Sequence, residues 1–497
     1  MDVPQGAQRQ KQQIVVVGAG IAGMATAIRL AAAGHQVRLC EANTHLGGKL
    51  TDTYLGEYRF DNGPSLFTMP DLLEELFSVA GKKLSDFLEY ERLDLVTRYF
   101  YPDGIVLNAW SDSERFASEA NQKTGIPKSR LLRYFGRAGF IYETTTPVFL
   151  ERSLHRWSNY LRAIALRGIV RLPWLGTHIS MHRFNALWLQ EPHMVQLFDR
   201  FATYNGSDPY RAPATLAQIA HIEHALGAWY PKGGMIAIRN ALQQLLELMG
   251  VEVLYNHRVD EVLTHKTRVT AVRVGEKILE ADKVVFGGDV HQLYERLLHT
   301  KLQLKLKQQA LSTSAIIFQW AVADTHPQLD LHNIFFSSDY KHEFKQLATG
   351  KVTDDPTIYL YVSARKNQSD APPGCENWFV MINTPPNSGQ DWESQVAKSR
   401  AQILKRLEDV LQASIGAQIV AESVITPVEL EKRTGSKGGA IYGNASNTRW
   451  AAFLRHANYS SRIKGLYFVG GSVHPGGGIP LCLYSARIVD ELIHGRQ

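Results

Sequence analysis

The chain has 497 residues, which is too long for one compact core, so two or three domains of roughly 100–200 residues are expected. Hydrophobic residues make up 44% and charged residues 21%, values that are typical of a soluble globular protein and exclude disordered and fibrous classes. The formal net charge of +6 is too weak to indicate nucleic-acid binding, and no nucleic-acid partner is expected.

The cysteine pattern and the hydropathy indicate an intracellular protein. Cys40, Cys375 and Cys482 lie far apart without metal-ligand spacing, so neither a disulfide framework nor a metal site is expected. Residues 1–13 are polar and do not read as a secretory signal, and no uninterrupted apolar run is long enough to span a bilayer. We therefore expect a cytoplasmic protein whose contact with the inner face of the cell membrane is peripheral.

The first elements form a βαβ unit. Residues 13–17 are a β-branched run of strand type, and residues 21–33 follow with a helical pattern that Gly34 stops. A second apolar strand over residues 37–40 ends at Glu41. This order is typical of the opening of a Rossmann-type domain.

The turn between the first strand and the helix carries a dinucleotide fingerprint. Its sequence is Gly18-Ala19-Gly20-Ile21-Ala22-Gly23, with Glu41 about 20 residues downstream as the full motif requires. The first glycine permits the tight turn, the second lets the backbone approach the pyrophosphate, and the third brings helix and strand together. Glu41 can bind the ribose hydroxyls and would repel a 2′-phosphate, so NADP is disfavoured. The motif alone leaves FAD and NAD open.

A second glycine pair, Gly47 and Gly48, follows Glu41 closely and precedes Lys49. The glycines allow close backbone approach, and Lys49 offers a cation to a pyrophosphate or a flavin. Here the chain resembles the flavoproteins with two dinucleotide-binding motifs, a group that contains amine oxidases, protoporphyrinogen oxidases and carotenoid desaturases. The resemblance implies that the cofactor is FAD.

Two further segments resemble cofactor contacts of this group. Asp61-Asn62-Gly63-Pro64 looks like the D-x-G-P element by which carotenoid desaturases approach the flavin ring. Val259 lies in a segment that is similar to the one whose valine backbone holds the adenine. Without the family, the first segment is a Gly-Pro turn and the second is ordinary core.

The helical middle of the chain has a local excess of cations. Residues 151–183 contain one acidic residue, Glu151, and six arginines, at positions 152, 156, 162, 167, 171 and 183. Apolar side chains at helical spacing form one face: Leu154, Trp157, Leu161 and Ile164. Together with Trp174 they favour a helix lying in the lipid interface. The alternative is a solvated helix packed on the core.

The C-terminal segment is the most informative. A strand leads into residues 470–480, which hold five glycines and two prolines around His474, a backbone suited to close approach to a large planar ligand. This segment resembles the C-terminal signature of bacterial-type carotenoid desaturases, which implies cofactor contacts at Gly470, Gly471 and Ile479. His474 is the candidate catalytic acid or base, and a positional role is its alternative.

Details of this segment indicate which carotenoid desaturases the chain resembles most. Phytoene desaturases carry G-A-G-T-H-P-G, whereas this chain has Gly471-Ser472-Val473-His474 and continues as Pro480-Leu481-Cys482, like the 1-hydroxycarotenoid 3,4-desaturases. The resemblance implies an FAD-dependent oxidoreductase acting on CH–CH groups, with an acyclic 1-hydroxylated carotenoid as substrate and oxygen or a quinone as acceptor. The alternatives are a phytoene desaturase, an enzyme like the amine oxidases, and a flavin-holding carotenoid-binding protein without turnover.

Strand-rich stretches lie on both sides of the helical middle, which predicts an α/β fold assembled from discontinuous segments. We expect a Rossmann-type FAD-binding domain, a mixed-sheet substrate domain and a helical insert with a possible membrane face. The expected FAD-binding segments are 1–70, 225–305 and 425–497; the substrate-domain segments are 71–114 and 306–424; the insert is 115–224. Later strands are predicted at 251–255, 268–274, 283–287, 314–322, 357–362, 378–383 and 466–469.

Overall fold

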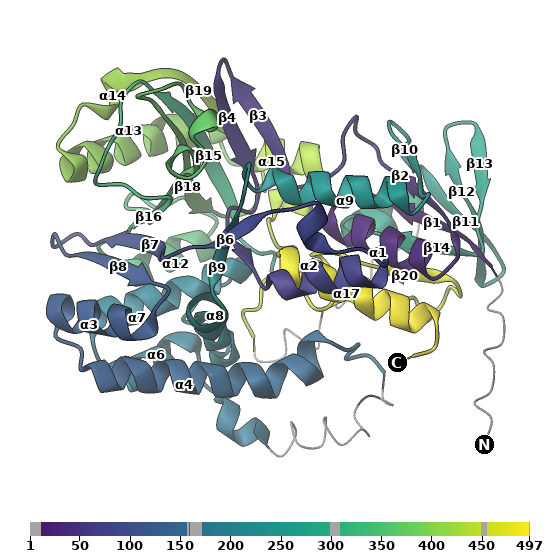
Figure 1. The fold of residues 1–497 in the computed structure, drawn as a ribbon, viewed down its shortest axis with the longest axis horizontal. Helices are drawn as coiled ribbons and strands as arrows, with labels where there is room; N and C mark the ends of the chain where they lie inside the picture. Colours follow the sequence, from purple (N-terminus) through teal and green to yellow (C-terminus); the bar gives the residue numbers. More distant parts are fainter. Residues whose placement is uncertain (1–10, 157–158, 160–170, 299–308, 449–454, 497) are drawn as a thin grey trace.

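The computed structural model describes residues 11–156, 159, 171–298, 309–448 and 455–496. A parallel sheet with its helices, a mixed sheet and a group of helices form three regions that meet near the centre of the molecule (Figure 1). The predicted α/β class is therefore confirmed.

The nucleotide-binding region is built on a five-stranded parallel sheet of order β10-β2-β1-β14-β20. Its strands come from distant segments, which confirms the discontinuous assembly: β1 (Gln13–Val17), β2 (Gln36–Cys40), β10 (Glu252–Leu254), β14 (Lys283–Phe286) and β20 (Leu466–Phe468). Both faces are covered, which explains the continuous apolar run of β1. On one face lie α1 (Ile21–Ala32), α2 (Pro70–Val79), α9 (Ile236–Leu248) and α17 (Ile479–Ile493); on the other lie β11 (Glu261–His265), β12 (Arg268–Val274) and β13 (Lys277–Glu280).

The mixed sheet has seven strands in the order β19-β15-β18-β17-β16-β7-β8, and only β16 and β7 pair in parallel among its described strands. The bounds are β7 (Leu95–Phe100), β8 (Val106–Trp110), β15 (Ser314–Val322), β16 (His332–Phe335), β17 (Ile358–Val362), β18 (Glu376–Thr384) and β19 (Ile419–Ile425). Every residue of β15 is buried, because both faces of the strand are covered. On one face α13 (Trp392–Leu411) packs through Ile403 and Leu407, and on the other Ala315 and Ile317 belong to a second apolar cluster. This sheet forms one wall of the cavity described below.

Smaller elements join these regions. The hairpin of β3 (Thr51–Leu55) and β4 (Tyr58–Asn62) contacts the mixed sheet, and β5 (Phe67–Thr68), β6 (Tyr90–Arg92) and β9 (Ala228–Pro231) form a small sheet. The remaining described α-helices outside the helical region are α10 (Val290–Gln292), α12 (Tyr340–Ala348), α14 (Ile415–Gln418) and α15 (Pro427–Thr434).

The helical region lies below the mixed sheet in Figure 1 and has an aromatic core that includes Tyr134, Phe198 and Phe201. Its α-helices are α3 (Ser113–Thr124), α4 (Lys128–Thr145), α6 (Met181–Leu189), α7 (Pro192–Asp199) and α8 (Gln218–His221). Short helical turns extend it: η2 (Thr146–Leu150), η4 (Leu172–Leu175), η5 (Arg200–Asn205), η6 (Ala214–Ala217) and η7 (Ile222–Leu226). Within the described ranges, no helix combines the length and the hydrophobicity needed to cross a membrane.

One predicted element is wrong where it can be compared. The sequence predicts a helix from Leu154, but residues 151–156 form bends and turns. The C-terminal segment holds this backbone, because Tyr459 Oη donates to His155 O at 2.8 Å and His474 Nε2 lies 2.9 Å from Arg152 O. The rest of the predicted face, Trp157, Leu161 and Ile164, and the arginines at 162 and 167 lie outside the described residues. The segment boundaries of the predicted domains stay a prediction.

Candidate functional site

A cavity of about 1860 Å³ lies where the three regions meet. It opens at the carboxyl ends of β1, β2 and β14, the edge where open parallel sheets bind ligands. The mixed sheet and the helical region supply the other walls. Pockets for one small ligand are usually about 300–1,000 Å³, so this cavity has room for a dinucleotide and a second ligand.

The fingerprint glycines have the conformations that their roles require. Gly18 has a φ of +93°, as the tight turn requires, and its N–H donates to Cys40 O at 2.8 Å, which extends the pairing of β1 with β2 to the start of the turn. A Cβ on Gly23 would lie 2.0 Å from Gly18 O, so only glycine lets α1 pack this closely on β1. Gly20 is the N-cap of α1 and lines the cavity, and this places the positive end of the helix dipole at the cavity.

Glu41 is buried at the end of β2, and its carboxylate is held toward the fingerprint. Its Oε2 accepts from the N–H of Ala19 at 2.8 Å, and its Oε1 accepts from the N–H and the side-chain amide of Asn43 at 2.9 and 2.8 Å. A carboxylate has about four lone-pair sites, so acceptors remain for ribose hydroxyls. The position of Glu41 in the cavity wall fits the predicted ribose contact.

The second glycine pair closes the floor of the site against the fingerprint. A Cβ on Gly48 would lie 3.1 Å from Gly20 Cα, and one on Gly63 would lie 2.0 Å from Lys49 O. Lys49 Nζ donates to Ala440 O at 3.3 Å and to Ile441 O at 2.5 Å. Burial lowers the pKa of Lys49, and Asp289 partly offsets this shift. Lys49 lines the cavity, so a cofactor bound there can contact it, as predicted from the sequence.

The C-terminal loop, which follows β20 of the same sheet, also lines the cavity. Gly470 has a φ of +104°, and a Cβ there would lie 3.4 Å from Gly287 O. Gly471, Gly478 and Ile479 also line the cavity, and Gly478 is the N-cap of α17. A second helix N-terminus therefore faces the cavity, and its dipole favours negative charge.

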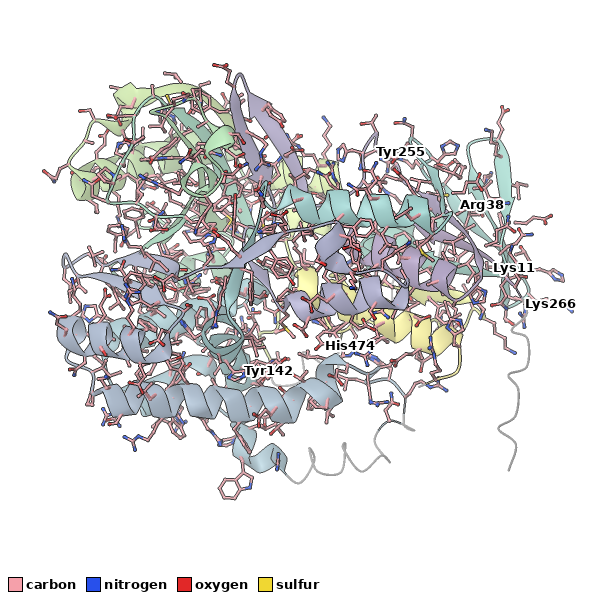
Figure 2. All side chains as sticks on the ribbon, viewed as in Figure 1. Lys11, Arg38, Tyr142, Tyr255, Lys266 and His474 are labelled. Carbon is pink, nitrogen blue, oxygen red and sulfur yellow. The ribbon has the colours of Figure 1, made fainter. Side chains whose placement is uncertain are left out.

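His474 is buried in the same loop, between α17 and the helical region (Figure 2). Its Nε2 donates to Arg152 O at 2.9 Å, and its Nδ1 has no partner within the described part of the chain. Burial lowers the pKa of His474 to about 3, so the imidazole is neutral at neutral pH, and its single ring proton is held in the hydrogen bond to Arg152 O. This arrangement favours the positional role, and the catalytic role stays a prediction.

The structure brings the predicted site residues together. Those that line the cavity are Gly18, Gly20, Glu41, Gly48, Lys49, Gly63, Pro64, Val259, Gly470, Gly471, His474 and Ile479. Ala19 and Gly23 do not line the cavity but support residues that do. Ala19 donates a hydrogen bond to Glu41, and Gly23 allows α1 to pack closely on β1. Gly287, Gly288 and Asp289, which follow β14, also line the cavity and were not among the predicted site residues. In the sequence, the only feature that indicates these residues is a strand that ends in two glycines and an aspartate. A group of buried polar residues that no motif marks was likewise not predicted.

The model of the family described as flavin containing amine oxidoreductase matches residues 21–491. The chain belongs to this family. A 1-hydroxycarotenoid 3,4-desaturase from a Flavobacterium species is 42% identical over 97% of this chain and 99% of that protein. A 4,4′-diaponeurosporene oxygenase from Staphylococcus aureus is 32% identical over 98% of this chain and 99% of that protein. The predicted resemblance to the carotenoid desaturases is confirmed.

Solved structures share the fold of this chain. An oxidoreductase from Methanosarcina mazei matches with a TM-score of 0.63 over 97% of this chain and 100% of that chain, at 13% identity. The flavoprotein has FAD as its cofactor, and the residues present fit this group. The glycine floor leaves no space for side chains, Glu41 retains free acceptors, and two helix N-termini face the cavity.

Replacing Glu41 with alanine is expected to weaken FAD binding about ten- to hundred-fold, because hydrogen bonds to a charged acceptor are lost. The flavin content of the purified protein and its dissociation constant measure this effect. Glu252→Ala is the matched control, because Glu252 lies on the adjacent β10 and is exposed. Equal flavin content in both variants would show that Glu41 does not bind the cofactor. The wild-type protein should not bind NADP.

Proposed function

We propose that this flavoprotein is a carotenoid desaturase that introduces a double bond at C3–C4 of an acyclic, 1-hydroxylated carotenoid. The 42% identity to a 1-hydroxycarotenoid 3,4-desaturase over nearly the whole length of both chains carries the proposal. The Gly471-Ser472-Val473-His474 version of the C-terminal loop, which resembles that of the 1-hydroxycarotenoid 3,4-desaturases, agrees with it. The loop lines the cavity, so the residues that vary within the family lie at the site itself.

In this reaction the substrate loses a hydride from one carbon and a proton from its neighbour, and a carbon–carbon double bond forms. FAD, when bound, supplies the acceptor for the hydride. The chain supplies binding and orientation. Apolar side chains such as Leu66, Ile334 and Phe379 line the cavity, exclude water and suit a polyene. Gly63 and Pro64, which the resemblance assigns to the flavin ring, also line the cavity.

Expression in hosts that accumulate different carotenoids, followed by pigment analysis, tests the proposal. Each added conjugated double bond shifts the carotenoid spectrum to the red. The expected product arises from a 1-hydroxylated acyclic carotenoid, while phytoene is left largely unchanged. Stepwise desaturation of phytoene alone would favour a phytoene desaturase. An oxygenated product would favour the activity named for the Staphylococcus aureus relative.

We also propose peripheral membrane contact, at an exposed patch formed by Trp174, Leu187 and Trp188 of the helical region. Two arginines border it: the Arg137 guanidinium donates to Trp174 O and lies 5.7 Å from the centre of the Trp188 ring, and Arg171 lies over Phe140. Tryptophan with flanking cations is typical of surfaces that enter the lipid interface. A substrate that is dissolved in the bilayer requires such access.

Replacing Trp174 and Leu187 with serine is expected to reduce binding to anionic vesicles about tenfold or more, because two exposed apolar side chains no longer enter the interface. Co-sedimentation with vesicles measures the loss. Added salt should weaken the binding of the wild-type protein to the same vesicles, because it screens the flanking arginines. Leu248→Ser with Ile278→Ser is the control, since both residues are similarly exposed but lie on the nucleotide-binding region. Equal sedimentation of both double variants would contradict the assignment of this patch.

A further inference from the structure

A group of buried polar side chains interrupts the apolar wall of the cavity. We call it the polar cluster; it lies where the helical region meets the mixed sheet, and it consists of Arg200, Tyr204, Glu223, His332, Tyr340 and Tyr359. All of them line the cavity. A hydrocarbon polyene offers no partner to such groups, so their presence needs a physical reason.

The first half of the polar cluster is an incompletely paired ion pair. Arg200 Nη2 donates to Tyr204 Oη at 3.4 Å and to Tyr99 Oη at 2.7 Å. Tyr204 Oη donates to Glu223 Oε2 at 2.6 Å, while Arg200 Nη2 and Glu223 Oε1 are 3.9 Å apart. Arg200 Nε and Glu223 Oε1 have no hydrogen-bond partner among the residues that the structure describes. One donor and one acceptor are therefore left unmatched; both atoms are buried behind the cavity surface of these residues.

The second half connects the polar cluster to the D-x-G-P element. Ser65 Oγ, directly after Pro64, lies 2.6 Å from Tyr359 Oη, and Tyr359 Oη lies 2.8 Å from His332 Nδ1. His332 Nε2 also lacks a partner within the described ranges. Burial lowers the pKa of His332 to about 3, with Arg200 adding to the shift, so the imidazole is neutral. Through Tyr359 and His332, the polar cluster is thus hydrogen-bonded to the segment that the reacting part of the substrate must reach.

The chemistry of the proposed substrate explains this position. In a 1-hydroxylated acyclic carotenoid, a single carbon separates C1 from the C3–C4 bond that is oxidised. A group that recognises the hydroxyl must therefore lie next to the reaction centre and not at the far end of a tunnel. A hydroxyl can donate one hydrogen bond and accept others, which matches an unmatched carboxylate oxygen and an unmatched guanidinium N–H.

We propose that the side chains of Glu223 and Arg200 turn toward the cavity when substrate binds, that Glu223 accepts the hydrogen bond of the substrate hydroxyl, and that Arg200 donates to the same oxygen. This pair then selects hydroxylated over unhydroxylated carotenoids. This inference rests on the proposed function and adds the residues that determine specificity. Tyr204 orients the carboxylate through its hydrogen bond to Oε2. An unhydroxylated substrate leaves the pair unmatched in a closed cavity, which is how buried polar sites reject analogues that lack a hydroxyl.

The test compares one 1-hydroxylated acyclic carotenoid with the same carotenoid lacking the hydroxyl, each presented in liposomes to the FAD-loaded protein. Glu223→Gln is expected to lower the ratio of the two kcat/KM values about ten- to hundred-fold, and Tyr204→Phe should lower it less. Binding without turnover, followed by quenching of protein fluorescence, should show the same fall in preference. Flavin content and the thermal unfolding midpoint identify any variant that has lost its fold.

Glu343→Gln is the matched control. Glu343 is likewise buried with an unpaired Oε1 within the described chain, but it lies outside the cavity lining. The inference is overturned if Glu223→Gln and Tyr204→Phe bind flavin and keep the wild-type preference, because the polar cluster then holds only water or serves packing. Failure of the wild-type protein to bind or oxidise either carotenoid would instead contradict the proposed function.

Discussion

Replacing Arg59 with alanine is expected to lower the free energy of unfolding by about 3–5 kcal/mol, the usual cost of breaking a buried ion pair. Arg59 donates to both carboxylate oxygens of Asp370 at 2.7 and 2.8 Å and to Asp61 Oδ1 at 2.8 Å, and all three side chains are buried. Asp370 and Asp61 hold the pKa of Arg59 above its usual value, against the opposing effect of burial. Without Arg59, two carboxylates remain close together in a dry environment.

This loss should also affect the cofactor site. Asp61 accepts from the backbone N–H groups of Met235 and Ile236 at the start of α9 and directly precedes the Asn62-Gly63-Pro64 turn. Urea unfolding followed by circular dichroism, with flavin release recorded in parallel, measures both effects. Arg115→Ala is the control, because the Arg115–Asp94 pair is exposed and should contribute less than about 1 kcal/mol. Equal midpoints for the two variants would contradict the structural role of Arg59.

Acidification from pH 7 to pH 5 is expected to destabilise the protein strongly. Burial lowers the pKa of four histidines: His224 and His456 to about 4, and His332 and His474 to about 3. Below the unfolded value of 6.5 the unfolded chain gains protons that the folded chain does not bind. The contribution of these neutral histidines to the free energy of unfolding is therefore complete above pH 6.5. It is lost as the pH falls from 6.5 toward their folded pKa values of about 4 and about 3. At pH 5 each of these histidines lowers the free energy of unfolding by about 2 kcal/mol relative to neutral pH.

Urea unfolding at pH 7, 6 and 5 tests this expectation. His224→Phe is a useful variant, because His224 packs against the rings of Phe116 and Phe135 and lies outside the cavity lining. Its loss of stability between pH 7 and pH 5 should be smaller than that of the wild type by about 2 kcal/mol. Identical pH dependence in both proteins would show that His224 is protonated in the folded chain.

The sequence was sufficient for the elements whose pattern is local. Residues 268–274 and 314–322 form β12 and β15 with the predicted bounds, because both are rich in β-branched or aromatic residues. The grouping of the expected cofactor residues around one cavity could be predicted as well, since the glycines perform backbone roles that a motif records. Leu154 shows the limit: its spacing predicts a helix, but contacts with the distant C-terminal loop determine the backbone there.

The polar cluster could not be predicted for a related reason. Arg200, Glu223 and His332 come from separate stretches, and each reads alone as an ordinary residue of a helix or strand. Only the folded structure shows that these three residues line one cavity and that each has an unpaired polar atom among the described residues. Asp289 is an intermediate case, because the two glycines before it mark the end of a parallel strand.

Anaerobic titration of the FAD-loaded protein with a 1-hydroxylated acyclic carotenoid tests the central claim most directly. Without an external acceptor, each desaturation must reduce one flavin. The proposed function predicts bleaching of the flavin absorbance together with a red shift of the carotenoid, both saturating at one equivalent of substrate per flavin. An oxidised flavin and an unchanged carotenoid spectrum, in protein shown to bind the carotenoid, would contradict desaturation and leave a carotenoid-binding flavoprotein without turnover.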